Sequence, residues 1–343
     1  MIASAALRKS EVYQQTNGKV LDFELLRTPV VAKEKGMIIR NIKDFDLVSS
    51  IEQYPASILK TLCKDMTTGR NILWATDSYK EQYNIQGCEQ VSPELVKKYS
   101  IIVPRVAKRI ESQKDRTKKR AEVFTPSWIC NKMNSDVDEE WFGYKDAFNT
   151  PHDKTWTVNM RKVKIPKDKN WKEYVSQTKL EITCGEAPFI TTRYDAMTGD
   201  LMPVNERIGF LDRKLRIVRE NAYDEEEYFE QAFTALKSCY GYEYQGDNLL
   251  IARINVFLSF AEAVKDINGE DLTNEQAKEA ANIIAWNIWQ MDGLKGTVPD
   301  VGQVYEVDKG VAECLIKDWM ATTKAGKLLK NGRTVTYNSL KEA

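Results

Sequence analysis

The chain is poor in the residues that build zinc sites and nucleophilic catalytic triads. His152 is its only histidine, and none of its six cysteines belongs to a Cys-x-x-Cys pair. A zinc site of cysteine and histidine is therefore not expected, and neither is a Ser-His-Asp or Cys-His arrangement. Scattered cysteines of this kind are typical of a reduced, cytoplasmic protein with buried thiols.

Net charge and long apolar runs are also missing. The sequence has 50 basic and 50 acidic side chains, so its formal net charge is zero and it predicts no global attraction to nucleic acid. No apolar run approaches the length of a membrane span, and the first ten residues are charged too early for a signal peptide. A chain of 343 residues with 42% hydrophobic residues corresponds to one large soluble domain or two ordinary ones.

The segment from Leu180 to Ile190 is the most informative one that is present. It begins as a strand, passes the acid Glu181 and turns sharply at Cys184 and Gly185. A glycine lets the backbone approach a ligand closely, and a helix after the turn would present its N-terminal amide groups. We therefore expect a strand, a turn and a helix that bind a nucleotide-sized cofactor.

The chain after residue 190 alternates between helical and strand patterns. Apolar spacing predicts helices over 206–219, 225–237, 247–264 and from Thr273 onward, with a strand over 238–243. This alternation predicts an α/β protein with a doubly wound, Rossmann-like sheet.

Glu243, at the end of the strand predicted over 238–243, is expected to accept hydrogen bonds from the two ribose hydroxyls of a cofactor. It follows Glu181 by far more than the usual separation of about 20 residues. Either the region 191–237 is an insertion, or another residue has the ribose role.

Two segments concentrate positive charge. Residues 105–120 carry eight basic side chains without interleaved aromatic residues, which fits either the solvated face of a helix or contact with phosphates. The tail 324–343 is basic as well, and its Asn-Gly pair at 331–332 predicts a hairpin turn.

Four short motifs occur in a specific order: Phe124-Thr-Pro126, the turn at Cys184-Gly185, Glu243 and Asp292. This order resembles the adenine-N6 DNA methyltransferases of bacterial restriction–modification systems, and the resemblance covers residues 70–320. It implies a methyltransferase core, S-adenosylmethionine as cofactor, DNA as a partner and a possible partner subunit. It implies neither a metal nor a membrane.

The resemblance also assigns residues. In the family, the Phe-x-Thr-Pro segment lies along the methionine end of the cofactor, and an acid in the position of Asp292 lies near the adenine amine. Glu186 and Ala187 depart from the family, which has serine and glycine there. The implied cofactor-binding residues are Phe124, Thr125, Pro126, Glu181, Cys184, Gly185, Phe189, Glu243 and Asp292.

The family's catalytic motif, Asn/Asp-Pro-Pro-aromatic, is absent, because no two prolines are adjacent in this sequence. That motif holds the target amine and stacks on a flipped base, so that catalysis is mostly alignment. Two segments, each expected to contain a strand, end in an acid and an aromatic residue and are its candidates. One is 314–319, with Asp318 and Trp319, where a further strand of the sheet is expected; the other has Asp77 and Tyr79 after a strand predicted over 71–77. Packing explains both aromatics better than catalysis, and no catalytic residue is assigned.

We therefore expect three parts. Residues 1–104 form an N-terminal α+β extension, residues 105–323 a methyltransferase-like core that is possibly incomplete, and residues 324–343 a basic tail. The expected function is that of an S-adenosylmethionine-binding DNA adenine-N6 methyltransferase-like protein. The main alternative is a non-catalytic subunit whose partner carries the missing motif. A methyltransferase for another substrate, or a protein that binds another adenine nucleotide, stays open.

Overall fold

Three short parallel strands lie at the centre of the computed structural model, which describes residues 33–34, 37–38, 41–108, 113, 116–118, 125–301 and 311–340. They are β5 (Lys179–Glu181), β6 (Cys239–Glu243) and β7 (Ile288–Gln290), adjacent in that order. In the register, Leu180 lies opposite Tyr240, and Tyr242 lies opposite Trp289. The protein is therefore of the mixed α/β class that the sequence predicts.

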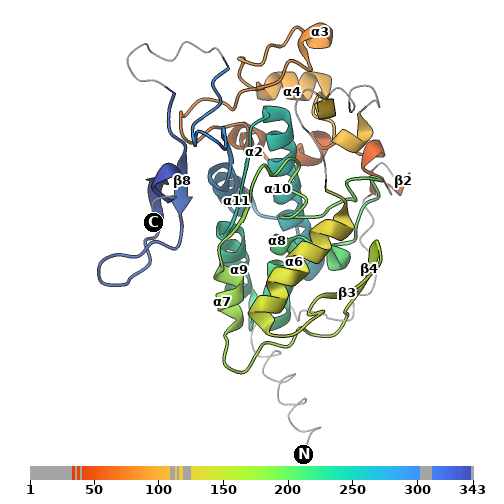
Figure 1. Cartoon of the computed structure of the whole chain (residues 1–343), viewed down its shortest axis with the longest axis vertical. Helices are drawn as coiled ribbons and strands as arrows, with labels where there is room; N and C mark the ends of the chain where they lie inside the picture. The colour runs from red at the N-terminus through yellow and green to blue at the C-terminus, as the bar shows by residue number, and fades with distance from the viewer. Residues whose placement is uncertain are drawn as a thin grey trace, which may run out of the picture.

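Pairs of helices connect these strands (Figure 1). Between β5 and β6 lie α8 (Phe210–Asn221) and α9 (Glu225–Lys237); between β6 and β7 lie α10 (Gly246–Asn268) and α11 (Asn274–Asn287). Two of these helices begin at side chains that accept hydrogen bonds from backbone amides. Asp224 caps α9, and Thr273 forms a capping box with Gln276 at α11. The helices predicted over 225–237 and from Thr273 are confirmed.

The remaining elements surround this centre. The helix α6 (Ser127–Phe142) lies across the front of the molecule in Figure 1. The other helices are α2 (Ser57–Leu62), α3 (Lys80–Tyr83), α4 (Pro93–Tyr99) and α7 (Trp171–Ser176), with 3-10 turns at Ile42–Asp44, Ser49–Ile51, Arg105–Ala107, Val204–Glu206 and Asn338–Leu340. Three antiparallel hairpins pair β1 (Lys33–Glu34) with β2 (Met37–Ile38), β3 (Asn149–His152) with β4 (Thr155–Val158), and β8 (Leu315–Asp318) with β9 (Arg333–Thr336).

The described part of the N-terminal hundred residues packs directly on the central strands and helices. Arg253 of α10 is fully buried, and its guanidinium donates to the carbonyls of Leu62 and Lys64, both at 2.6 Å, and of Ile288 and Ala285 at 2.7 and 3.1 Å. One cluster of buried apolar side chains extends from Ile42 to Trp319. A buried cation therefore joins the end of α2 to the rest of the core.

Glycine is required where the N-terminal region meets α10. The Gly246 amide donates to the carbonyl of Trp74 at 2.9 Å, and a side chain at position 246 would overlap the carbonyl oxygen of Leu73. The same stretch is held by Gln290, which exchanges two hydrogen bonds of 2.8 Å with the Leu73 backbone. These contacts fix residues 73–74 beside the ends of β6 and β7.

Three sequence predictions about secondary structure are wrong. No helix follows the turn at Cys184 and Gly185; the chain runs through turns until α8 begins at Phe210. Phe189 and Ile190, whose amides donate to the side chain of Glu181, lie in these turns. Residues 71–77, predicted as a strand, form only isolated bridges.

The hairpin β8–β9 departs from the expected sheet. Asp318 ends β8, which pairs antiparallel with β9 and not with the parallel sheet. The prediction that this segment supplies a further strand of that sheet is therefore wrong.

Helices able to cross a membrane are not found in the part of the chain that the structure describes.

We expect replacement of Arg253 by Met to destabilise the protein strongly. The substitution removes the donor of four carbonyl oxygens, three of them in buried hydrogen bonds, at a cost of about 3 kcal/mol or more in the free energy of unfolding. Urea unfolding followed by circular dichroism measures it. Lys265→Met, in the same helix, is the matched control, because Lys265 is half exposed and pairs only with exposed Asp271. Equal effects of the two substitutions would contradict the role given to Arg253.

Candidate functional site

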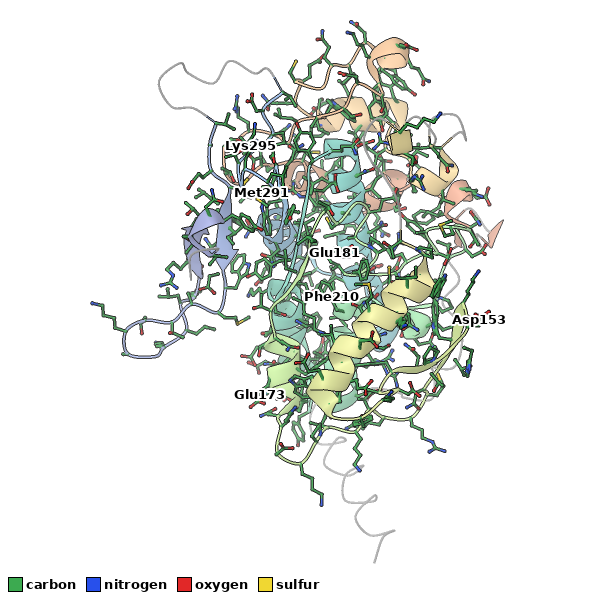
Figure 2. All side chains as sticks on the ribbon, in the orientation of Figure 1. Asp153, Glu173, Glu181, Phe210, Met291 and Lys295 are labelled. Atoms are coloured by element: carbon green, nitrogen blue, oxygen red, sulfur yellow. The ribbon has the colours of Figure 1, made fainter. Side chains whose placement is uncertain are left out.

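A cavity of about 850 Å³ opens where β5 and β6 end. Its volume is in the range of small-molecule and cofactor sites. Figure 2 shows Glu181 and Phe210, two of its lining residues, near each other beside α6. The lining residues are Thr125, Met133, Asn134, Val137, Lys179, Leu180, Glu181, Ile182, Thr183, Cys184, Gly185, Pro188, Phe189, Phe210, Glu243, Tyr244, Gln245 and Asn248.

Glu243 ends β6 and holds two loops in place. One carboxylate oxygen accepts from the Gly185 amide at 2.9 Å, and the other accepts from the Gln245 amide at 3.0 Å. The side chain is buried, and burial raises the pKa of Glu243 although these amide bonds oppose the shift.

Glu181, at the end of β5, also accepts hydrogen bonds from backbone amides of the neighbouring loop. Its two oxygens accept from the amides of Phe189 and Ile190 at 3.3 and 3.0 Å. Burial raises the pKa of Glu181 to about 8, opposed by these amide bonds and reinforced by the nearby Glu243 carboxylate. A cation placed in the cavity would favour the ionised form of Glu181.

The loop between these acids has a constrained backbone. Thr183, Gly185 and Ala187 all have positive φ, at 46°, 55° and 66°. Glycine adopts this conformation freely, whereas it is unusual for a β-branched residue such as Thr183. Backbone strain of this kind is concentrated at functional sites when the surroundings enforce it, and here the two buried carboxylates do so.

Six of the nine residues predicted to bind a cofactor line this cavity: Thr125, Glu181, Cys184, Gly185, Phe189 and Glu243. Pro126 is the N-cap of α6 and does not line it. Phe124 lies outside the described residues.

Glu186 and Ala187, which depart from the family motif, are buried away from the cavity lining. The Glu186 carboxylate accepts from the Arg105 amide and the Tyr194 hydroxyl, both at 2.6 Å. Glu186, the residue that differs from the family motif, thus binds residue 105 to the loop and leaves the cavity open.

Asp292 does not line the cavity. Its carboxylate accepts the amides of Leu294 and Lys295 at 3.0 and 3.2 Å, which makes it the first residue of a turn after β7. Figure 2 shows its neighbour Met291 separated from Glu181 and Phe210. The structure therefore gives Asp292 a local structural role and does not bring it to the six residues above.

The two catalytic candidate pairs also lie outside the cavity lining. The Tyr79 hydroxyl donates to buried Asp247 at 2.8 Å, while Asp77 is exposed. Trp319 is buried with its indole N–H on Asn287 at 2.7 Å, and the Asp318 carboxylate accepts the Met320 amide at 3.1 Å. Both aromatics have packing positions.

Part of the basic segment 105–120 is bound internally. Asp247, fully buried at the start of α10, accepts from Arg116 at 2.8 Å and from Lys108 at 3.2 Å. Burial alone would raise the pKa of Asp247, but these two cations hold it well below its usual range. Lys108 and Arg116 therefore stabilise the wall behind the cavity, where Arg116 also contacts Asn248 at 3.2 Å.

Sequence reasoning missed one wall of the cavity. Met133 and Val137 are one helical turn apart on α6 and contribute exposed apolar surface, and Phe210 comes from the first turn of α8. Asn134, between them, donates to the carbonyls of Phe189 and Ile208 at 3.1 and 3.0 Å. The i, i+4 spacing of Met133 and Val137 is the only signal that the sequence offers for this wall.

No protein-family model matches this chain, and neither a curated protein nor a solved structure matches it. Its function is therefore argued from the cavity and from the motifs that line it.

We expect the stability of the protein to fall as pH rises from about 5 to 8. In this window the unfolded chain has ionised Glu181, whereas the folded chain still binds its proton, so each pH unit costs at most about 1.4 kcal/mol. Glu181→Gln, which resembles the protonated acid, should reduce this slope. Urea unfolding at pH 5, 6.5 and 8 measures both proteins. An unchanged slope in the variant would show that Glu181 titrates normally.

Proposed function

We propose that the cavity binds S-adenosylmethionine and that the chain is a DNA adenine-N6 methyltransferase-like protein of a restriction–modification system. One observation carries this proposal: residues from three distant segments line one cavity, namely Thr125, seven residues between Glu181 and Phe189, and Glu243. The motif order selects six of these residues from the sequence alone: Thr125, Glu181, Cys184, Gly185, Phe189 and Glu243.

The residues of the cavity fit such a cofactor. Glu243 lines the cavity, and a carboxylate can accept hydrogen bonds from ribose hydroxyls as well as from backbone amides. Ile182, Phe189 and Phe210 offer apolar contact area around the acids. When bound, S-adenosylmethionine supplies a methyl group on a positively charged sulfur. Burial opposes the ionisation of Glu181. The positive charge on the sulfur would stabilise the ionised form of this side chain.

We also propose that the parallel strands are one half of a doubly wound, Rossmann-like sheet. Strands β5, β6 and β7 lie side by side in chain order with helical connections, as one half of such a sheet requires. Within the described ranges, β5 has a strand on one side only. Ligands in doubly wound folds bind at the carboxyl ends of the strands, which is where this cavity opens.

One candidate from a second functional class is supported by the open edge of β5. The Lys179 amide donates to the carbonyl of Ser238, the residue before β6, at 3.0 Å. Successive residues of a parallel strand bond alternately to the two sides, so the N–H and C=O of Leu180 face away from β6. Leu180 and Ile182 are 43% and 63% exposed. We therefore propose, as the alternative, a non-catalytic subunit whose partner adds a strand there and supplies the Asn/Asp-Pro-Pro-aromatic motif.

Cofactor binding is the first test. Titration calorimetry of the purified chain should show saturable binding of S-adenosylmethionine and S-adenosylhomocysteine. Glu243→Ala should weaken it by about 10- to 150-fold, because a charge-assisted hydrogen bond to the ribose is lost. Glu279→Ala, on an exposed part of α11, is the control and should bind normally. No binding to the folded wild-type chain would refute the assignment of the cavity.

Methyl transfer separates the two candidate functions. The chain is incubated with tritiated S-adenosylmethionine and adenine-containing duplex DNA, alone and with a protein that carries the missing motif. If the chain is the enzyme, it labels DNA alone. If it is a subunit, it binds the cofactor but labels DNA only with the partner protein. Labelling in neither case, with cofactor binding intact, would point to another substrate.

A further inference from the structure

The strands β8 and β9 form a two-stranded ribbon whose connection leaves the body of the protein. Figure 1 shows this connection looping away from the helices before the chain returns to β9. Residues 322–333, called the basic tongue from here on, form the connection and its return. Thr322 and Leu328 pair across it in an antiparallel bridge, and the Leu329 amide donates to Ala321 at 2.9 Å. The basic tongue is thus a folded hairpin with its own backbone bonds.

The charge of the basic tongue is of one sign. Lysine or arginine stands at every third position, Lys324, Lys327, Lys330 and Arg333, and no Asp or Glu occurs between Asp318 and Glu342. The three lysines are exposed, and among the described residues none of them has an acidic partner within 4 Å. Arg333 has one weak pair, with Asp318 at 3.4 Å. This is a concentrated cation surface in a chain of zero net charge.

The tip of the basic tongue faces solvent. Thr323 accepts the Gly326 amide at 2.9 Å to close a turn, and a side chain added at Gly326 would meet nothing within 4 Å. Thr322, Thr323 and Asn331 are exposed as well. These neutral donors lie among the cations, and such side chains often contact phosphate oxygens in DNA complexes.

We propose that the basic tongue contacts the phosphate backbone of double-stranded DNA. Cations without compensating acids gain binding free energy by releasing the counterions of DNA. A two-stranded ribbon is narrow enough to enter the major groove. The proposal deepens the function proposed above, since it names the surface that meets the DNA, and it does not depend on the cofactor cavity.

The composition of the basic tongue favours DNA over a lipid surface. A membrane-bound element needs an extended apolar face beside its cations. Leu328 is the one large apolar side chain of the tongue among the strongly exposed ones. Phosphate contact of this kind adds affinity without sequence preference. Other residues of the protein or of a partner would therefore have to contact the bases.

The test measures binding of the full chain to a fluorescent 20-base-pair duplex between 50 and 200 mM KCl. The variant K324Q/K327Q/K330Q should bind at least tenfold more weakly, and the slope of log K against log salt should fall by about 0.9 per lost contact, or nearly 3 units. The variant K324R/K327R/K330R keeps the charges and should behave like the wild type. Calorimetry with S-adenosylmethionine on the same proteins shows separately whether the cofactor cavity is intact.

The control variant K154Q/K167Q/K278Q removes three exposed lysines from other parts of the surface. Equal losses in the two glutamine variants would overturn the proposal, because the effect would then be one of general charge. Absence of duplex binding by the wild type at 50 mM salt would also overturn it. Binding to vesicles with anionic lipid but not to DNA would replace it with a membrane contact, and would leave the cofactor proposal untouched.

Discussion

The cavity depends on two buried carboxylates, Glu181 and Glu243, that stand at the ends of neighbouring parallel strands. Both accept hydrogen bonds from backbone amides, and three of those amides, of Gly185, Phe189 and Ile190, belong to the loop 182–190. Burial opposes the ionisation of both acids and raises the pKa of each. The amide hydrogen bonds lower these pKa values, but only in part. Positive charge placed in the cavity would favour the ionised forms of both acids.

A second set of buried charges joins distant parts of the chain to this cavity. Arg253 binds carbonyls at the end of α2, and Asp247 binds Lys108 and Arg116 from the segment before α6. Both residues lie on α10, the helix that follows Glu243. Removing one member of a buried ion pair is strongly destabilising, because the other charge is then buried without a partner. The described part of the N-terminal hundred residues, which Arg253 contacts at Leu62 and Lys64, is thus part of the structural support of the cavity.

The local features were predictable from sequence, and the long-range ones were not. The cap at Thr273 and the helix over 225–237 follow from side chains within four residues, so the sequence contains the whole cause. Asp292 shows the limit: an acid after a strand can face a ligand or accept the amides of its own turn, and only the path of residues 293–297 decides. The same holds for Glu181, which accepts the amides of Phe189 and Ile190 in turns that lie where the sequence predicts a helix. Met133, Val137 and Phe210 reach the cavity through tertiary packing alone.

Zero net charge does not argue against contact with DNA. Electrostatic interactions in salt solution decay over about 8–10 Å, so a partner senses the charges nearest to it and not the sum over the chain. Two of the basic residues before α6, Lys108 and Arg116, form ion pairs with Asp247 inside the protein. Those of residues 322–333 project from the body without nearby acids in the sequence. Acidic and basic side chains are therefore equal in number but unevenly distributed. Internal ion pairs stabilise the cavity, while a surplus of basic side chains is exposed on a narrow ribbon that a polyanion can contact.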